Sequence, residues 1–354
     1  MRSAVSAILV FAASSAAAAN VEVPLNDITI NLSALMQAGY SYYFQDDAQT
    51  REHVGSGYFS GQIYRIGVNG YLSDRFFYRA EYGTDLDTRN YVGFRVSDRF
   101  TVKAGQDVIP YTVEGQLLPE QYITTSLTHL TDIFERRGFG LRGDFEIGNG
   151  NPRGGVSTGF YPFTSPTEGH LDTVTGRAFL AAALGKTELE FGVSGFERKE
   201  IRDEAVGEYP QIRFGTRYLP APRVAGDAAF RINGFAFLAE YSQYFVDGVL
   251  ITTGESRRGY YYKNLSETDY YGLAAYSFAL PWRYFHAFQP YSRYERYEPA
   301  VYGKRYIAKD YYTGGFDLYF LNNNLMFRAD YTRVLEDVLP MKNDVIASYF
   351  QLYF

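Results

Sequence analysis

Acidic side chains gather in one stretch of the sequence, where they could act on charged solutes. Residues 107–136 contain two prolines and no Lys or Arg before Arg136, and roughly thirty residues is too long for an ordinary hairpin connection. The acids of interest there are Glu114, Glu120, Asp132 and Glu135. Charged groups in a constriction of low dielectric discriminate ions by sign and by size. We therefore expect this stretch to be a loop that narrows an aqueous passage.

Basic side chains form a second set, at alternating positions of neighbouring amphipathic runs. Successive side chains of a strand point to opposite faces, so the apolar positions identify one face and leave the polar positions on the other. By this parity the inward, polar face carries Arg65, Arg79, Arg95, Lys103 and Arg142 on five consecutive predicted strands, Arg328 on a later strand, and the acids Glu81, Asp144 and Glu146. We expect a basic wall opposite the acidic loop. The alternative is that these cations are ordinary hydrated charges, paired with Glu81 or Asp144.

The elements that position these charges are predicted to be β-strands. The sequence has almost no sustained 3.6-residue periodicity, but many runs of about ten residues alternate apolar and polar side chains. It contains 34 Tyr, 28 Phe, a single Trp and no Cys, so disulfides and thiolate metal sites are excluded. Alternating strands rich in aromatic residues are typical of an outer-membrane β-barrel. A secreted β-sandwich or β-helix is the rival, but no linker or shift in composition divides the chain.

We predict an all-β fold, a transmembrane antiparallel barrel of sixteen strands whose long third extracellular loop folds inward. The strands are expected at 31–44, 62–72, 76–83, 90–96, 100–106, 138–147, 155–161, 176–184, 188–196, 228–232, 235–245, 270–279, 285–297, 310–320, 325–332 and 346–354. Residues 211–219 also alternate, but bacterial single-chain barrels have even strand numbers, so we place them in a loop. A barrel of this size leaves an aqueous channel rather than a filled core.

The two ends of the sequence indicate export and insertion. Residues 1–19 have a basic start, a short apolar core and a small-residue cleavage pattern, which predicts a signal peptide and a single barrel domain at 20–354. The last predicted strand alternates and ends in Phe354, which resembles the terminal signature by which bacterial outer-membrane barrels engage the barrel assembly machinery. Both termini are then expected on the periplasmic side.

Several short motifs are spread over nearly the whole mature chain. They are Tyr64-Arg-Ile-Gly-Val68, Val102-Lys-Ala-Gly-Gln106, Glu135-Arg-Arg-Gly138, Thr175-Gly-Arg177 and Asn233-Gly-Phe-Ala-Phe-Leu-Ala-Glu-Tyr241. In this order they resemble the phosphate-selective porin O/P family. The resemblance implies a trimeric sixteen-stranded channel with arginine-lined walls and a third loop that constricts the lumen. Phosphate-specific members of that family use lysines in the constriction, whereas residues 107–136 have none.

Competing chemistry has little support in the sequence. Residues 155–159 fit G-x-S-x-G, but a nucleophile elbow needs a strand–turn–helix context, and Ser157 falls inside an amphipathic strand. The four histidines are scattered without metal-binding spacing. We therefore expect no catalysis and no cofactor, with an outer-membrane phospholipase or protease as the enzyme alternative. Inward-facing Tyr71, Tyr319 and Tyr353 keep a sugar-specific porin open as a further alternative.

The sequence thus predicts a passive diffusion channel in the outer membrane of a Gram-negative bacterium. Its cargo would be small hydrophilic solutes or ions, with anions such as phosphate as one class. The expected partners are outer-membrane lipid and lipopolysaccharide, the barrel assembly machinery and two further copies in a homotrimer, and no nucleic acid. A structural or adhesive barrel with a plugged lumen is the third hypothesis.

Overall fold

The computed structural model describes most of the predicted barrel. The described residues are 22–25, 28–46, 53–84, 88–116, 124, 137–148, 151–163, 173–201, 213–214, 218–246, 249–252, 259–262, 265–298, 308–321, 324–336 and 343–353. The predicted signal peptide lies outside them, as do Glu120, Asp132, Glu135 and Phe354.

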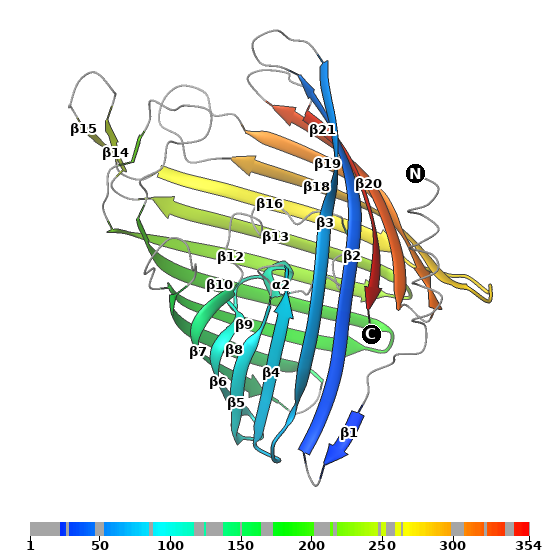
Figure 1. Cartoon of the computed structure of the whole chain (residues 1–354). Coiled ribbons are helices and arrows are strands. Elements are labelled where there is room, and N and C mark those ends of the chain that lie inside the picture. Colours follow the sequence, from blue (N-terminus) through cyan, green and yellow to red (C-terminus); the bar gives the residue numbers. More distant parts are fainter. Residues whose placement is uncertain are drawn as a thin grey trace.

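The strands of the described residues form one large sheet that closes on itself (Figure 1). Neighbours are antiparallel and follow the chain from β2 (Ile28–Asp46) to β21 (Asn343–Tyr353), which pairs with β2. The sheet has 18 strands, but β1 (Glu22–Leu25) pairs only with β2, and β17 (Phe278–Ala279) continues β16 (Leu265–Tyr276), which leaves a wall of 16. The predicted antiparallel barrel of sixteen strands is therefore confirmed.

The other wall strands follow the same order in space and in sequence. They are β3 (His53–Tyr71), β4 (Phe76–Gly83), β5 (Asn90–Ser97), β6 (Phe100–Val108), β7 (Arg137–Ile147), β8 (Arg153–Phe163), β9 (Thr173–Leu184), β10 (Thr187–Ile201), β12 (Tyr218–Ile232), β13 (Phe235–Val246), β18 (Phe285–Glu298), β19 (Lys309–Phe320) and β20 (Leu325–Glu336). One helical turn, α2 (Val113–Gln116), lies within the ring of strands (Figure 1).

Tight turns fix the register of neighbouring strands. Asn233 and Gly234 join β12 to β13 with φ values of 47° and 84°, the left-handed conformation that a two-residue hairpin of this type requires. At two other turns a serine hydroxyl accepts backbone N–H bonds: Ser73 Oγ from Phe76 at 3.2 Å, and Ser97 Oγ from Arg99 at 3.3 Å. These turns therefore close the hairpins β3–β4, β5–β6 and β12–β13.

Several strands extend well beyond the predicted segments. β3 begins at His53 and β12 at Tyr218, whereas the apolar–polar alternation predicts starts at 62 and 228. Only the membrane-embedded part of a strand must keep an apolar face, so alternation cannot locate the part that rises above the bilayer. Residues 211–219 are divided: Tyr218 and Leu219 belong to β12, and β11 (Arg213–Phe214) joins β14 (Val249–Thr252) and β15 (Gly259–Tyr262) in a separate three-stranded sheet.

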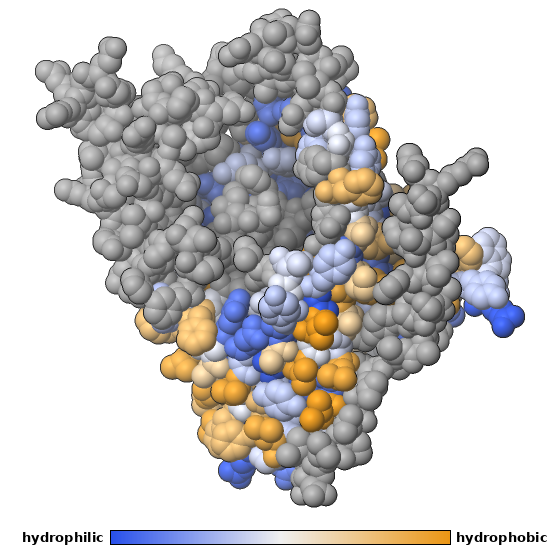
Figure 2. Space-filling view, viewed as in Figure 1, coloured by the Kyte–Doolittle hydropathy of each residue, from blue (hydrophilic) through white to orange (hydrophobic). Residues whose placement is uncertain are grey.

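Side chains on the two faces of the wall differ as a membrane barrel requires. Apolar residues on the outer face are exposed, among them Ile66, Val92 and Leu141, and Figure 2 shows apolar side chains gathered over the wall of β4–β8. Charged residues take the alternate, inward positions, as Arg65 does beside Ile66. Hydrocarbon covers the apolar face, so burial in this fold means contact with the interior of the barrel. Among the described residues, no helix has the length and apolarity needed to cross a membrane.

Candidate functional site in the barrel lumen

The segment that follows β6 turns into the barrel immediately after Val108. The carbonyl oxygen of Val108 accepts hydrogen bonds from Arg142 Nη1 at 3.1 Å and from the Tyr161 hydroxyl at 3.2 Å. Two residues later, the carbonyl oxygen of Pro110 accepts one from Thr175 Oγ1 at 3.0 Å. Side chains of β7, β8 and β9 therefore hold the root of the loop and direct it inward.

Beyond its root the segment docks on the far wall. The Tyr111 hydroxyl and Ser242 Oγ on β13 lie 2.8 Å apart, and the main-chain NH of Glu114 donates to Glu240 Oε1 at 2.6 Å. Tyr111 is buried against Phe196 on β10. Burial raises the pKa of the Tyr111 hydroxyl well above its usual range, so this group keeps its proton at neutral pH. The first part of the loop thus spans the lumen from β6 to β13.

A second anchor lies at Thr124, farther along the same segment. Arg293 Nη1 on β18 donates to Thr124 Oγ1 at 3.0 Å, and Arg328 Nη1 on β20 donates to the Thr124 carbonyl oxygen at 3.1 Å. Arg328 is held by an ion pair with Asp317, and both side chains are 0% exposed. Its guanidinium also lies 5.3 Å from the ring centre of Tyr349. The loop is therefore fixed at two places on the wall opposite its root.

The part of the wall formed by β3–β7, which we call the near wall, carries five of the predicted cations, several of them with acidic partners. Arg79 Nε donates to Glu81 Oε1 at 2.6 Å, and the arginine side chain is 20% exposed while that of the acid is 1% exposed. Arg65 faces inward and is buried, whereas Arg95 is exposed. The sequence predicted this pairing under the alternative that the inward cations are ordinary hydrated charges paired with Glu81 or Asp144.

Four charges form a compact quartet at the loop root: Lys103, Asp107, Arg142 and Asp144. Lys103 Nζ lies 3.4 Å from Asp107 Oδ2 and 3.3 Å from Asp144 Oδ2. Arg142 lies 2.7 Å from Asp144 and 3.8 Å from Asp107. The side chain of Asp107 is 4% exposed, against 19% for Lys103 and 11% for Arg142, so one acid of the quartet is buried beneath the cations. Glu146 lies two residues beyond on the same face and is exposed.

The structure brings together only part of the acid set that the sequence singled out. Glu114 lies inside the barrel, but it is buried beside Glu240 on β13 rather than facing the cations of β3–β7. Arg328 points inward and is wholly buried, so its contacts are those of a clamp for the loop. The other three loop acids lie outside the described residues.

Sequence reasoning missed a group of inward arginines on β9, β12 and β18. Arg177 on β9 is held by Asp227 and Glu190, with N–O distances of 2.6 and 3.0 Å. Arg223 on β12 lies 3.6 Å from Glu267, and Arg293 lies 3.7 Å from Glu295. The signal is present in the sequence, because the same parity that identifies Arg65 places all three on inward positions of their strands.

Ser157 occupies an inward position in the middle of β8. Its hydroxyl lies 3.5 Å from Arg142 Nη2, and the residues around it are all part of the strand. The strand–turn–helix arrangement of a nucleophile elbow is absent at this position. Within the described part of the chain, no group of three or more His, Cys, Asp or Glu side chains could hold a metal ion.

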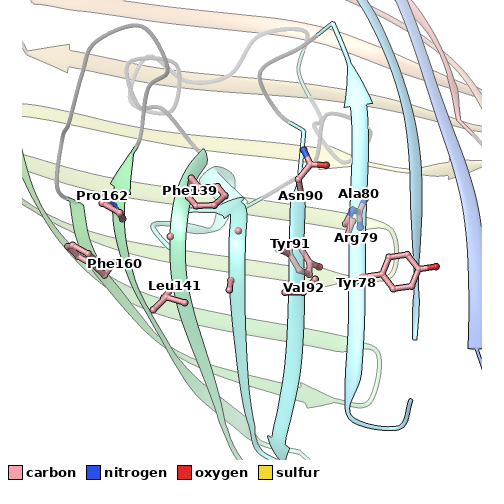
Figure 3. Close-up of a pocket in the computed structure, with 13 residues that line it drawn as sticks. Tyr78, Arg79, Ala80, Asn90, Tyr91, Val92, Phe139, Leu141, Phe160 and Pro162 are labelled. Atoms are coloured by element: carbon pink, nitrogen blue, oxygen red, sulfur yellow. The ribbon is translucent and has the colours of Figure 1, made fainter. Parts of the chain in front are cut away.

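An apolar groove runs over the outer face of β4–β8 (Figure 3). Its volume is about 720 Å³. The small residues Ala80 and Ala104 and the larger Tyr78, Leu141 and Phe160 are among the residues that line it. β4, β5 and β6 have 8, 8 and 9 residues, whereas the other wall strands have 11 to 19. The groove therefore lies over the shortest part of the wall.

Comparison with solved structures places this architecture among known barrels. No family model matches the chain, and no curated protein matches its sequence. The Salmonella typhi OmpF complex with daunomycin matches at 14% identity and a TM-score of 0.62, over 94% of this chain and 100% of that one. An anion-selective porin from Comamonas acidovorans matches at 10% identity and a TM-score of 0.57, over 92% and 100%. The fold is that of an outer-membrane porin.

A further match concerns assembly. The trimer form of in-vitro folded OmpT, an outer membrane protein of Vibrio cholerae, has 9% identity and a TM-score of 0.58, over 93% of this chain and 100% of that one. Identities this low establish the porin fold alone. The resemblance to the phosphate-selective porin O/P family stays a prediction.

Proposed function

We propose that this chain is a passive diffusion channel of a bacterial outer membrane, through which small hydrophilic solutes and ions cross without a catalytic step. The observation that carries the proposal is the loop pinned across a closed barrel of 16 strands, from Val108 at its root to Thr124. A barrel of this size without an inserted segment leaves a wide aqueous channel. A segment fixed across it sets the width of the passage, and charged inward side chains then act on the solute at short range.

We propose that the passage prefers anions. The near wall presents cationic groups to water more than their acidic partners: Glu81 and Asp107 are almost completely buried, while Arg79, Lys103 and Arg142 keep part of their surface and Arg95 is exposed. Asp144 and Glu146 oppose this preference, so we expect it to be moderate. Phosphate is one candidate anion, although the segment 107–136 carries no lysine to bind it.

We propose that three copies assemble through the outer face of β4–β6. A strand tilted in a bilayer needs about 9–11 residues to cross it, and strands of 8 and 9 residues reach this length barely or not at all. A neighbouring copy would cover these short strands and fill the groove that Ala80 and Ala104 line. Lipopolysaccharide around the rest of the barrel and the barrel assembly machinery are the other partners that we propose.

The experiment that tests the function is conductance of the purified, folded protein in a planar bilayer. Steady steps of current in KCl support the channel. Folded protein that inserts but carries no current contradicts it and favours a plugged barrel or a barrel enzyme. In the second case, phospholipase and protease assays should follow, with a Ser157→Ala variant as the first mutant.

A further inference from the structure

Three aromatic residues occupy inward positions of β3, β4 and β5, beside the charged side chains of the same strands. They are Tyr71, Phe77 and Tyr91, which we call the aromatic platform. Tyr71 pairs with Phe77 across the strands, and their ring centres lie 6.2 Å apart. The rings of Phe77 and Tyr91 are also 6.2 Å apart, edge to face. All three share the inward face with Arg79, because Arg79 is two residues from Phe77 and pairs with Tyr91.

A glycine allows the central ring to lie flat on the wall. Gly93 pairs with Phe77 across β4 and β5, and a Cβ atom at Gly93 would overlap the Phe77 ring. Any side chain at this position would therefore push the ring off the wall. Tyr71 is 44% exposed, and Phe77 and Tyr91 are half-buried, so ring surface stays open to the lumen. An apolar ring lying flat on a water-filled wall is suited to stacking against a flat solute.

Cationic groups flank the platform on both sides. Lys103 Nζ lies 5.3 Å from the ring centre of Tyr91, and Arg79 is the cross-strand neighbour of the same residue. Arg95 is two residues from Gly93 on the same face, is exposed, and makes no ion pair with any described residue. A neutral sugar would gain nothing from these charges. A planar ring that carries a carboxylate would use both the rings and the cations.

We propose that the aromatic platform, together with Arg79 and Arg95, is a lumenal binding site for aromatic carboxylates on their way through the pore. The inference rests on the proposed channel function and names a solute class for it. The ring of the solute stacks on Phe77 and meets Tyr91 edge to face, and its carboxylate lies against the guanidinium groups. A flat anion then moves along the wall towards Lys103 at the loop root. Conduction requires contacts weak enough to release the solute, and stacking on one ring and pairing in water are both weak.

The test measures how benzoate blocks the KCl current of the full-length protein in a planar bilayer. Benzoate should reduce the current at lower concentration than acetate, which lacks the ring, than benzyl alcohol, which lacks the charge, and than maltose. F77L and G93A should each raise the half-blocking benzoate concentration roughly two- to tenfold, the worth of one aromatic contact. Y71L, at the exposed end of the platform, should raise it by less. Each variant must carry the KCl current, which shows that it is folded.

F94L is the matched control, because Phe94 lies on β5 next to Gly93 but faces outward, where its ring contacts Phe76. It should leave the half-blocking concentration unchanged. Equal block by benzoate and acetate, or equal benzoate block in F77L, G93A and F94L, overturns the platform while leaving the channel intact. Stronger block by maltose than by benzoate overturns the carboxylate specificity. Absence of any KCl current from the folded wild-type protein would contradict the proposed channel function, and this inference would fail with it.

Discussion

The main-chain NH of Glu114 donates a 2.6 Å hydrogen bond to the carboxylate of Glu240. The bond joins the segment that leaves β6 to a strand on the other side of the lumen, and it buries Glu114 among acids rather than opposite the basic wall. Any transverse field across this pore would therefore come from the near-wall cations and from the rest of the loop. Under the proposed function, we expect the selectivity of the channel to be set where the near-wall cations keep contact with water.

Replacement of Arg328 by Met should weaken the anchor of the loop at Thr124, where the hydrogen bond from Arg293 remains. The variant leaves the buried Asp317 carboxylate without its partner, which should destabilise the barrel by about 3–5 kcal/mol. Urea unfolding in detergent measures this, and single-channel recording should show added current noise. R231M is the control, because Arg231 lies 3.6 Å from Glu188 with both side chains more than 60% exposed, and its loss should cost less than about 1 kcal/mol.

A second substitution separates the clamp from general stability. R328M combined with D317M removes both charges of the buried pair, and apolar replacement of a buried pair is often close to neutral. The double variant should regain most of its stability but still lack the bond to Thr124 and still show noisy current. Quiet current from a stable double variant would contradict the role of Arg328 as a clamp.

Loss of the Tyr111 hydroxyl should loosen the anchor of the loop on β13. Y111F and S242A each break the 2.8 Å hydrogen bond between the loop and β13, at a cost of about 1–3 kcal/mol because the remaining group is buried. A double-mutant cycle in urea unfolding should give a coupling energy of about 1 kcal/mol. Additive effects of the two substitutions would show that the bond does not contribute.

Alkaline pH should reduce the stability that the buried Tyr111 hydroxyl contributes. Burial raises the pKa of Tyr111 in the folded state above its unfolded value near 10, so the unfolded chain loses the proton first. The contribution of the protonated Tyr111 hydroxyl to the free energy of unfolding is fully present below about pH 10 and is lost as the pH rises above that value. Comparison of wild type with Y111F between pH 8 and pH 12 measures it. A difference between the two that stays constant over this range would be the contrary result.

Neutralising the quartet should move the channel towards cations. In K103Q or R142Q one cation of the near wall is lost, while Asp107 and Asp144 keep their charge. A unit charge at 4 Å in water is worth about 1 kcal/mol, so the anion-to-cation permeability ratio should fall by up to about fivefold. Reversal potentials in a KCl gradient measure this ratio. R231Q, at an exposed pair away from the quartet, should leave it unchanged.

A large side chain in the outer groove should break the assembly. In A104W an indole occupies part of the groove that Ala104 on β6 lines, so a neighbouring copy can no longer pack there. Native gels of the variant should show monomer, whereas A178W, on the outward face of β9, should migrate like wild type. Trimers of A104W with unchanged stability would place the subunit contact elsewhere.

The fold was predictable because its rules are local. Apolar–polar alternation located all sixteen wall strands, and Asn233-Gly234 forms the turn between the strands predicted at 228–232 and 235–245. The start of β3 at His53 was not predictable, since nothing requires an apolar face above the bilayer. The inward parity of Arg328 was predictable, but its clamp on Thr124 was not, because that contact joins residues 204 positions apart. The same holds for Gly93, whose role appears only when Phe77 is seen lying over it.

The measurement that tests the central claim most directly is the current through the folded wild-type protein in a planar bilayer under a KCl gradient. An open pore narrowed by a fixed loop should give steady, single-level steps, and the sign of the reversal potential should indicate anion preference. A cation preference would show that exposed acids such as Glu146, or the rest of the loop, outweigh the near wall. Folded, inserted protein that passes no current would contradict the channel itself.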